Sequence, residues 1–546
     1  MRILIIACLF MNFLTIPVVC AQDDPEERDP PEVAIGQRLF RDTRFAQFVS
    51  AKTNHDVNAP LSSGDPVMSY TATLNGKIAN PYSGGGINCA ACHFVDELVE
   101  TRGGGSRAYG DFTRRSPVPA RGDGKTTTVR NAPAFVNSTL HRNNEFFLHA
   151  DGEFTSTVDL VKGTITGRNF GWFPNERGRA ITHIAQVLRD DNGNDALGRE
   201  YGGSYTRILK GTDPAIPEEF RLPPEYCINI TTASDQEIFD AMARLVAAYV
   251  DSIVFENTSP YDRFLTLNGL PDQPATGENP LDYARRLGAA VEQLSSPRYV
   301  TPADGTFTLH AQEFVFGPKE LQGMKIFFRE NTAEDSKPLQ SVGNCIACHT
   351  PPVFTDFSFH NTGTAQEEYD SVHGPGAFAR LEIPGLDKRN RQPDEFLPVT
   401  ANHPHAREPF RAIPDPLHPG LTDLGVWNIF ANPDFPKAQA TLQNEICSRQ
   451  RKENPAADCS LQALLPKTIA LFKTVGLRDL GHTTPYFHNG RIDTIEGVIL
   501  AYINSSALAT RGLLRNADPA ISHIQIQARD VEALSAFLRS LNEDYD

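Results

Sequence analysis

Two segments of the chain repeat the pattern Cys-x-x-Cys-His, at Cys89-Ala90-Ala91-Cys92-His93 and Cys345-Ile346-Ala347-Cys348-His349. Two thiols at this spacing can add to the vinyl groups of a haem, and the next imidazole can bind its iron. A thioredoxin-like redox pair or half of a zinc site would explain one Cys-x-x-Cys, but not the histidine after both. The sequence therefore predicts two covalently bound c-type haems, with His93 and His349 as iron ligands.

The N-terminus and the remaining cysteines are typical of an oxidising compartment. Residues 1–21 combine one arginine, an apolar run and a small-residue exit at Val19-Cys20-Ala21, as a secretory signal peptide does. We expect cleavage after Ala21 and a periplasmic protein, with lipid attachment at Cys20 as the alternative. No other stretch approaches membrane-spanning length. Cys447 and Cys459 are close enough in sequence for a short disulfide, the alternative being two buried thiols, and Cys227 is left over.

Length and charge narrow the possible classes of protein. The 546 residues are ample for two domains with cores of their own. A net charge of -16 argues against nucleic acid and anionic membranes as partners and permits basic redox partners. The 40 prolines and 40 glycines indicate helices joined by long loops.

An internal repeat orders the chain around the two motifs. Gly36 to Phe40 before the first motif and Gly323 to Phe327 before the second have identical Gly-to-Phe spacing, and both look like the opening helix of a cytochrome c unit. Further along, two pairs of segments correspond with one residue of slippage: Phe147 to Gly152 with Tyr486 to Gly490, and Thr157-Val158-Asp159 with Thr494-Ile495-Glu496.

Each half closes with an amphipathic helix. The first is expected over Glu237–Ile253 after the capping box formed by Ser234 and Glu237, and the second over Val531–Leu541. The repeat predicts a mainly α fold of two cytochrome c-like helical domains related by duplication, with long loop insertions. We expect the domains at residues 22–318 and 319–546, the second with an insertion at 365–470.

Several further motifs resemble those of the bacterial di-haem cytochrome c peroxidases and their MauG relatives. They are Arg130-Asn131-Ala132-Pro133, Ser259-Pro260-Tyr261-Asp262-Arg263-Phe264, Phe354-Thr355-Asp356-Phe357-Ser358-Phe359-His360-Asn361-Thr362-Gly363, and Leu477-Arg478-Asp479-Leu480 leading into Thr483-Thr484-Pro485-Tyr486-Phe487-His488-Asn489-Gly490. The resemblance covers about half of the chain. Residues near 185–233, 265–318 and 365–470 are additions to the family's compact form.

The resemblance implies unlike roles for the two haems. In relatives, the electron-transfer haem takes its second ligand from a Met or Tyr fourteen residues after the histidine of Pro-Tyr-Phe-His, which here is Tyr502; no Met follows Met324. The alternative for Tyr502 is packing on a helix face. Carried through the repeat, the Tyr502 position falls on Ile165, which cannot bind iron. We therefore expect the N-terminal haem to be five-coordinate and to be the reactive one.

The chain departs from the family at the groups that move the peroxide proton. The Gln and Glu expected nine and nineteen residues after Asp151 are Leu160 and Phe170, and the family's Trp before that Asp is Ala150. The candidate substitutes for the acid–base group are His149, Arg168 and Glu176, each of which also has a purely structural interpretation. An apolar pocket with Phe170 or Trp172 over the iron would also suit oxygen binding, as in latex-cleaving haem oxygenases.

A calcium ion between the haems is the second implication of the resemblance. The family's oxygen ligands correspond to Asn131, Thr483 and Pro485. The alternative is a turn asparagine and a strand-breaking proline.

The resemblance thus implies a periplasmic di-haem oxidoreductase that reduces H2O2 at the N-terminal haem. Electrons would pass through the C-terminal haem from a small cytochrome c, a cupredoxin or an oxidisable protein side chain. Two alternatives stay open: a haem-dependent dioxygenase, and a non-catalytic electron carrier whose first haem is capped by His141, His149 or Met68.

Overall fold

The computed structural model describes residues 29–52, 56–60, 86–89, 92–93, 115–116, 118–141, 147–307, 310–331 and 340–544. The expected signal peptide and Met68 lie outside these residues. The described part is mainly helical, and its one sheet pairs β1 (Phe359–His360) with β2 (Phe472–Lys473) in antiparallel register. The expectation of a mainly α fold is confirmed. None of the described helices is both long and apolar enough to cross a membrane.

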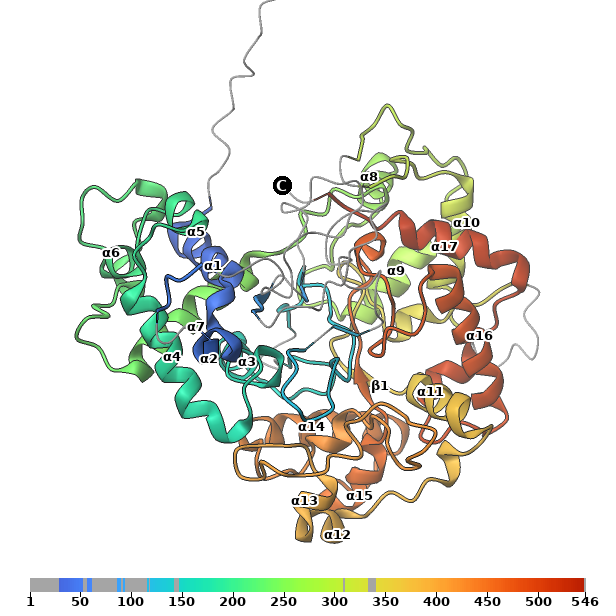
Figure 1. Ribbon diagram of the computed structural model, residues 1–546. Coiled ribbons are helices and arrows are strands. Elements are labelled where there is room, and N and C mark those ends of the chain that lie inside the picture. Colours follow the sequence, from blue (N-terminus) through green and yellow to red (C-terminus); the bar gives the residue numbers. More distant parts are fainter. Residues whose placement is uncertain are drawn as a thin grey trace, which may run out of the picture.

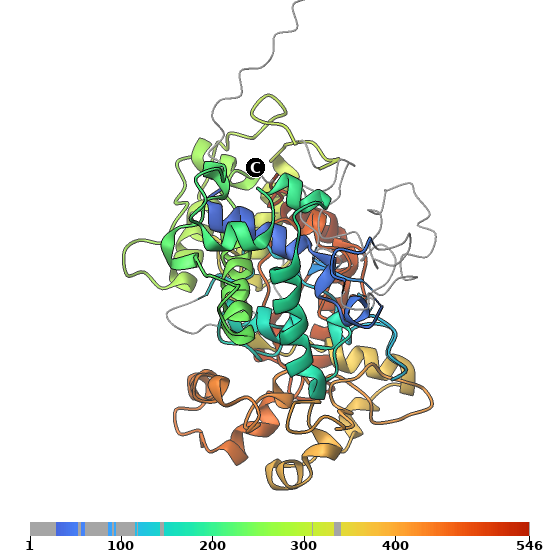
Figure 2. The same ribbon diagram turned by 60° about the vertical axis from the view of Figure 1, so that its left-hand side comes forward.

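The first helical unit is built around α1 (Pro31–Arg41), which crosses α7 (Asp235–Ser252) at Gly36. The helices α2 (Gln47–Lys52), α3 (Thr157–Ile165), α4 (Arg177–Asp190), α5 (Ala196–Glu200) and α6 (Tyr205–Lys210) complete it (Figure 1, left). The predicted capping box is present, since Ser234 and Glu237 hydrogen-bond each other's backbone at the start of α7. In Figure 2 this unit comes forward, with the insertion below it.

The second unit repeats this arrangement. Helix α10 (Pro318–Phe328) crosses α17 (Val531–Arg539) at Gly323, and α16 (Ile495–Thr510) packs against α17. Helices α8 (Pro260–Leu267) and α9 (Pro280–Glu292) also belong to this hydrophobic cluster, through side chains such as Tyr261 and Leu287. The domain boundary after residue 318 stays a prediction; this packing favours an earlier division, in the loop between α7 and α8.

The expected insertion at 365–470 forms a third hydrophobic cluster, centred on Trp427 and Phe410. It contains α11 (Thr364–His373), α12 (Leu386–Arg391), α13 (Pro393–Phe396), α14 (Gln439–Glu453) and α15 (Leu461–Leu464), most of which lie at the bottom of Figure 1. The predicted disulfide between Cys447 and Cys459 is present and joins α14 to the segment before α15. Phe147 of the first half packs in the same cluster, so the insertion bridges the two units.

The backbone gives the repeat a register without slippage. Two β-bridges correspond, Leu148 with Phe154 and Tyr486 with Ile492, and the first residue enclosed by each has positive φ, 63° at His149 and 67° at Phe487. The helix caps that follow, Ser156 and Thr494, have the same separation in sequence. This corrects the sequence-based alignment: His488 corresponds to Ala150, and Tyr502 corresponds to Thr164 rather than to Ile165.

Candidate functional site

The two Cys-x-x-Cys-His segments form the same backbone turn. The amide of His93 donates to the carbonyl of Cys89 at 2.9 Å, and the amide of His349 donates to that of Cys345 at 2.8 Å. The imidazoles are anchored alike, because Nδ1 of His93 lies 2.8 Å from the carbonyl oxygen of Pro133 and Nδ1 of His349 lies 2.9 Å from that of Phe354. A carbonyl can only accept, so each Nδ1 carries the proton and each Nε2 keeps its lone pair.

This geometry fits the demands of haem attachment. A haem-ligating histidine uses a neutral ring nitrogen, with the other nitrogen fixed by a backbone or carboxylate acceptor. Burial lowers the pKa of His93 to about 4 despite its bond to Pro133, so its ring is neutral near pH 7. Burial also lowers the pKa of His349.

Both motifs line one cavity of about 1430 Å³. That volume exceeds the roughly 300–1,000 Å³ typical of a site for a single small molecule. The cavity wall includes all four motif cysteines together with His93 and His349. The residues present and the volume of the cavity therefore fit two haems.

The end of the cavity near Cys345 and Cys348 carries Tyr502. This tyrosine lies on α16, lines the cavity, and has its ring centroid 5.9 Å from that of Phe487. Burial raises the pKa of Tyr502, and the nearby Cys348 and Cys345 thiols raise it further. The phenol of Tyr502 thus lies near the second motif and is carried by helix α16.

Among the described residues, the position that corresponds to Tyr502 in the first unit carries no tyrosine. Thr164, which occupies the corresponding position on α3, lines the cavity but offers only a hydroxyl. Ile165 is 1% exposed and belongs to the first hydrophobic cluster. The sequence-based conclusion that the mirrored position offers no side chain typical of haem-iron ligation thus holds with Thr164 in place of Ile165.

Three residues were expected to replace the family's acid–base group, and Phe170 was expected in an apolar pocket over the iron; the structure places these four residues in different surroundings. His149, Arg168 and Phe170 line the cavity, whereas Glu176 is not among its lining residues. The guanidinium of Arg168 donates to both carboxylate oxygens of Asp123, at 2.7 and 2.8 Å. Phe170 is buried beside Trp172, whose indole donates to the carbonyl of Phe45.

The carboxylate of Glu176 is occupied by hydrogen bonds that stabilise the local structure. Its carboxylate accepts two hydrogen bonds from Arg121, at 3.0 and 3.1 Å, and one from the amide of Phe173 at 2.9 Å. Partial burial would raise its pKa, but these hydrogen bonds lower the pKa below its ordinary value. An ionised carboxylate with these partners stabilises the turn before α4 and has no proton to give.

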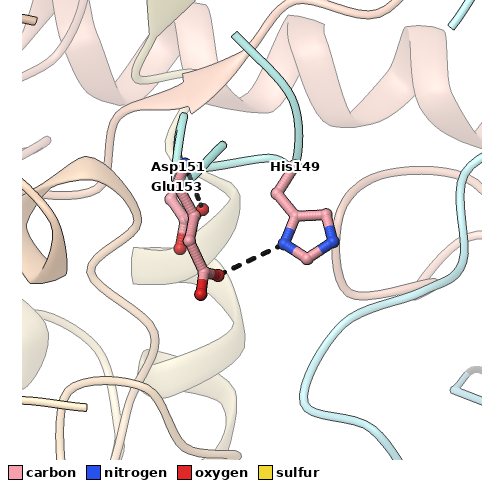
Figure 3. A group of neighbouring side chains, drawn as sticks. All are labelled: His149, Asp151 and Glu153. Carbon is pink, nitrogen blue, oxygen red and sulfur yellow. Dashed lines mark hydrogen bonds and ion pairs between the residues drawn. The ribbon is translucent and has the colours of Figure 1, made fainter. Parts of the chain in front are cut away.

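Figure 3 shows His149 beside two carboxylates, of Asp151 and Glu153. Nδ1 of His149 lies 3.3 Å from Oε2 of Glu153. Arg130 donates to Asp151 at 2.6 Å, and Arg411 donates to both Asp151 and Glu153. The three side chains have the composition of a cation site, but two guanidinium groups already neutralise the carboxylates, which makes the group a poor one.

Glu153 and Arg411 were missed by sequence reasoning. Glu153 follows Asp151 by two residues, and that closeness was the one signal available. Arg411 lies in the insertion, 258 residues away from Glu153, and nothing in its local sequence points to this contact.

The expected calcium ligands also come together. The side-chain amide nitrogen of Asn131 lies 2.5 Å from the carbonyl oxygen of Pro485, and the backbone amide of Asn131 donates to His488 at 2.7 Å. Asn131, Thr483 and Pro485 all line the cavity. In this rotamer the amide presents its nitrogen to Pro485; with the amide flipped, Oδ1 of Asn131 and the carbonyl oxygen of Pro485 would be the two oxygens available to a cation.

One proposed cap for the first haem does not line the cavity. His141 is not among the lining residues, and its ring contacts the carbonyl of Thr139.

No protein-family model matches the chain. A curated relative, the cytochrome-c peroxidase IdrP2 of Pseudomonas sp. (strain SCT), is 33% identical over 78 residues, which are 14% of this chain and 19% of the relative. The chain thus matches about a fifth of that protein's length. The relative is a cytochrome c peroxidase, in agreement with the resemblance drawn from the motifs.

Two solved structures overlay on most of the chain at low identity. The di-haem peroxidase BthA from Burkholderia thailandensis is 16% identical, with a TM-score of 0.42 over 94% of this chain and 87% of that one. A MauG-like protein associated with microbial copper homeostasis is 16% identical, with a TM-score of 0.41 over 96% and 95% of the two chains. Neither overlay bears on the activity.

Proposed function

We propose that the chain is a haem-dependent oxidoreductase of the di-haem cytochrome c peroxidase and MauG type. The observation that carries the proposal is the pair of anchored histidines, His93 and His349, which line one cavity with unlike surroundings. Tyr502 lies near the second motif, and Thr164 occupies the mirrored place near the first. When bound, haem iron would supply the redox chemistry at these two places.

The reaction proposed is H2O2 + 2 e⁻ + 2 H⁺ → 2 H2O at the first haem. In it, Cys89, Cys92 and His93 hold the reactive haem, and Cys345, Cys348, His349 and Tyr502 hold the haem that relays electrons. The electrons come from a small cytochrome c, a cupredoxin or an oxidisable protein, in the periplasm. Asn131, Thr483 and Pro485 supply oxygens for a calcium ion between the two sites.

His149 is the best-placed acid–base group on the described wall of the first site. Its Nδ1 is bonded to Glu153, which leaves Nε2 without a hydrogen bond among the described residues. With haem bound, the imidazole of His149 would be the group that accepts a proton from one peroxide oxygen and returns it to the other. Arg168 and Phe170 line the same end of the cavity, the former adding positive charge and the latter excluding water.

The decisive experiment is to record absorption and EPR spectra of the oxidised holoprotein before and after adding H2O2. The proposal expects one high-spin and one low-spin haem, and a spectral change of the high-spin haem with peroxide that is slowed in His149→Ala. Two low-spin haems, with the first converted to high-spin by His149→Ala, would show instead that His149 binds the first iron.

A second candidate function is a di-haem electron carrier. It is favoured by the same Nε2 of His149, which has no hydrogen bond among the described residues and could bind the first iron. A haem-dependent dioxygenase is favoured by the apolar pair Phe170 and Trp172 at the cavity. It would be recognised by a stable adduct of the reduced protein with O2 and by the absence of a reaction with H2O2.

A further inference from the structure

Arg411 belongs to the insertion in the second half, yet its guanidinium binds the first half beside the candidate reactive site. Its Nη2 donates to Oδ2 of Asp151 at 3.1 Å and also to Oε2 of Glu153. The Asp151 side chain is fully buried, and those of Glu153 and Arg411 are 14% and 19% exposed. One nitrogen atom therefore bridges two enclosed carboxylates.

This contact determines what Glu153 can do. Burial raises the pKa of Glu153, but the charge of Arg411 and the hydrogen bond from His149 outweigh burial and hold the pKa well below its ordinary range. An ionised carboxylate only accepts hydrogen bonds, so the proton in its bond with His149 belongs to Nδ1. In the neutral imidazole, Nε2 then carries the lone pair.

The insertion also binds the loop that carries His149 through a second ion pair. Asp423 accepts hydrogen bonds from Nε and Nη2 of Arg130, at 2.5 and 2.9 Å, and Nη1 of the same arginine donates to Asp151 at 2.6 Å. Arg411 and Asp423 are themselves joined by a β-bridge within the insertion. The short loop from Leu148 to Phe154, in which His149 has positive φ, is thus fixed from the insertion side.

The insertion also forms part of the cavity wall. Its lining residues include Val399, Thr400, Ala406, Glu408, Arg411 and Phe435. The site around the first motif is therefore incomplete without residues that follow the second motif in sequence.

We propose that Glu153 and Arg411 are positioning residues for His149, so that the insertion in the second half completes the reactive site of the first. This inference rests on the proposed function, in which His149 moves the peroxide proton. Glu153 fixes the tautomer and direction of His149, and Arg411 keeps Glu153 ionised and in place.

Four variants of the holoprotein test the inference. Arg411→Met keeps the length of the side chain and removes its positive charge. Glu153→Gln keeps the shape of the side chain and removes its negative charge. Arg411→Lys keeps the positive charge on a single nitrogen that can reach both carboxylates. The matched control is Lys437→Ala, because Lys437 also joins the insertion to the first half, at 2.7 Å from Asp159, but is 71% exposed and does not line the cavity.

Three rates are measured by stopped flow on each variant. H2O2 and HCN must each lose a proton to react with ferric haem, whereas CO binds ferrous haem without proton transfer. We expect Arg411→Met and Glu153→Gln to slow the reactions with H2O2 and cyanide by about 10- to 100-fold and to leave CO binding unchanged. Arg411→Lys should stay within about threefold of the wild type, and Lys437→Ala should match it.

Two results would overturn the inference. An equal slowing of CO binding would mean that Arg411 supports packing alone. Wild-type rates in Arg411→Met, with slow rates in His149→Ala, would leave the proposed function standing without the positioning role. A wild type inert towards H2O2 overturns the proposed function separately, and the cyanide rates still decide whether Arg411 and Glu153 act through His149.

Discussion

Gly36 of α1 lies so close to α7 that a β-carbon at this position would overlap the carbonyl oxygen of Leu245 and come within 2.8 Å of the β-carbon of Tyr249. Gly323 of α10 has the same relation to α17, where a β-carbon would overlap the carbonyl oxygen of Ala533 and lie 2.8 Å from the β-carbon of Phe537. In both units the helices can cross at this distance only because the residue at the crossing has no side chain.

The first prediction follows from that contact. Gly36→Ala should lower stability by about 3 kcal/mol, the upper part of the range for overpacking, because backbone rather than a flexible side chain must move. Gly178→Ala is the control: Gly178 lies in α4 with no atom within 4 Å of its added methyl, and alanine there should stabilise by about 0.5–1 kcal/mol. Thermal unfolding followed by circular dichroism measures both. Equal melting temperatures for the two variants would refute the close crossing.

The second prediction concerns Tyr502. If its phenolate binds the second iron, Tyr502→Phe should convert the low-spin EPR signal of the oxidised protein to high-spin and leave the first haem unchanged. Tyr486→Phe is the matched control, since Tyr486 lines the same cavity but donates its hydroxyl to the carbonyl of Leu480 at 2.8 Å. A low-spin signal that survives in Tyr502→Phe would assign this tyrosine to packing.

The third prediction is a pH dependence at the contact between the insertion and the first unit. Burial raises the pKa of Asp423, but Arg130 outweighs it and lowers the pKa from 3.8 to about 2. A carboxyl with a depressed folded-state pKa contributes stability above its unfolded value, near pH 3.8, and loses it as the pH falls through about 2.

Asp423→Asn should therefore cost on the order of 2 kcal/mol at pH 7, and the difference from the wild type should shrink between about pH 4 and 2. Asp387→Asn, at an exposed position in the same insertion, is the control for removing one surface carboxylate. Denaturant unfolding at several pH values measures both. A cost that stays constant down to pH 2 would show that Asp423 acts through packing rather than charge.

The fourth prediction concerns the disulfide. Cys447 and Cys459 close a loop with a sequence separation of 12, and removing such a crosslink typically costs about 2–3 kcal/mol. The double variant Cys447→Ala/Cys459→Ala should therefore unfold its insertion at lower denaturant concentration. Hydrogen exchange in α14 should rise while exchange in α1 and α7 stays at the wild-type level. Equal protection of α14 in both proteins would contradict it.

Local patterns predicted the features that depend on near neighbours in sequence. The haem-binding motifs, the capping box at Ser234, the paired glycines and the short disulfide all belong to this class. The register was wrong by one residue in each pair of matched segments, because His149 was matched to His488 and Thr157 to Thr494 by residue type. The backbone matches His149 to Phe487 instead, since both have positive φ, and conformation rather than side-chain identity determines the register of such a turn.

The acid–base environment could not be read from the sequence for a different reason. Glu176 looked suitable because it is an acid near Arg168, but its carboxylate is occupied by Arg121 and the amide of Phe173. The carboxylate that does contact His149, Glu153, owes its ionised state to an arginine 258 residues away. Contacts of this range are set by tertiary packing and leave no periodic or spacing signal.

The placement of the insertion has a consequence for the order in which the molecule is made. Lining residues between 399 and 435 supply part of the cavity wall and are synthesised about three hundred residues after Cys89 and Cys92. A haem joined to the first motif before the insertion has been made would be exposed to water on the side that the insertion covers. It would become enclosed only after Arg411 and Asp423 dock onto the loop of His149. Closure of the first site is thus a late step in biogenesis, and chains truncated before residue 411 would present an open first site.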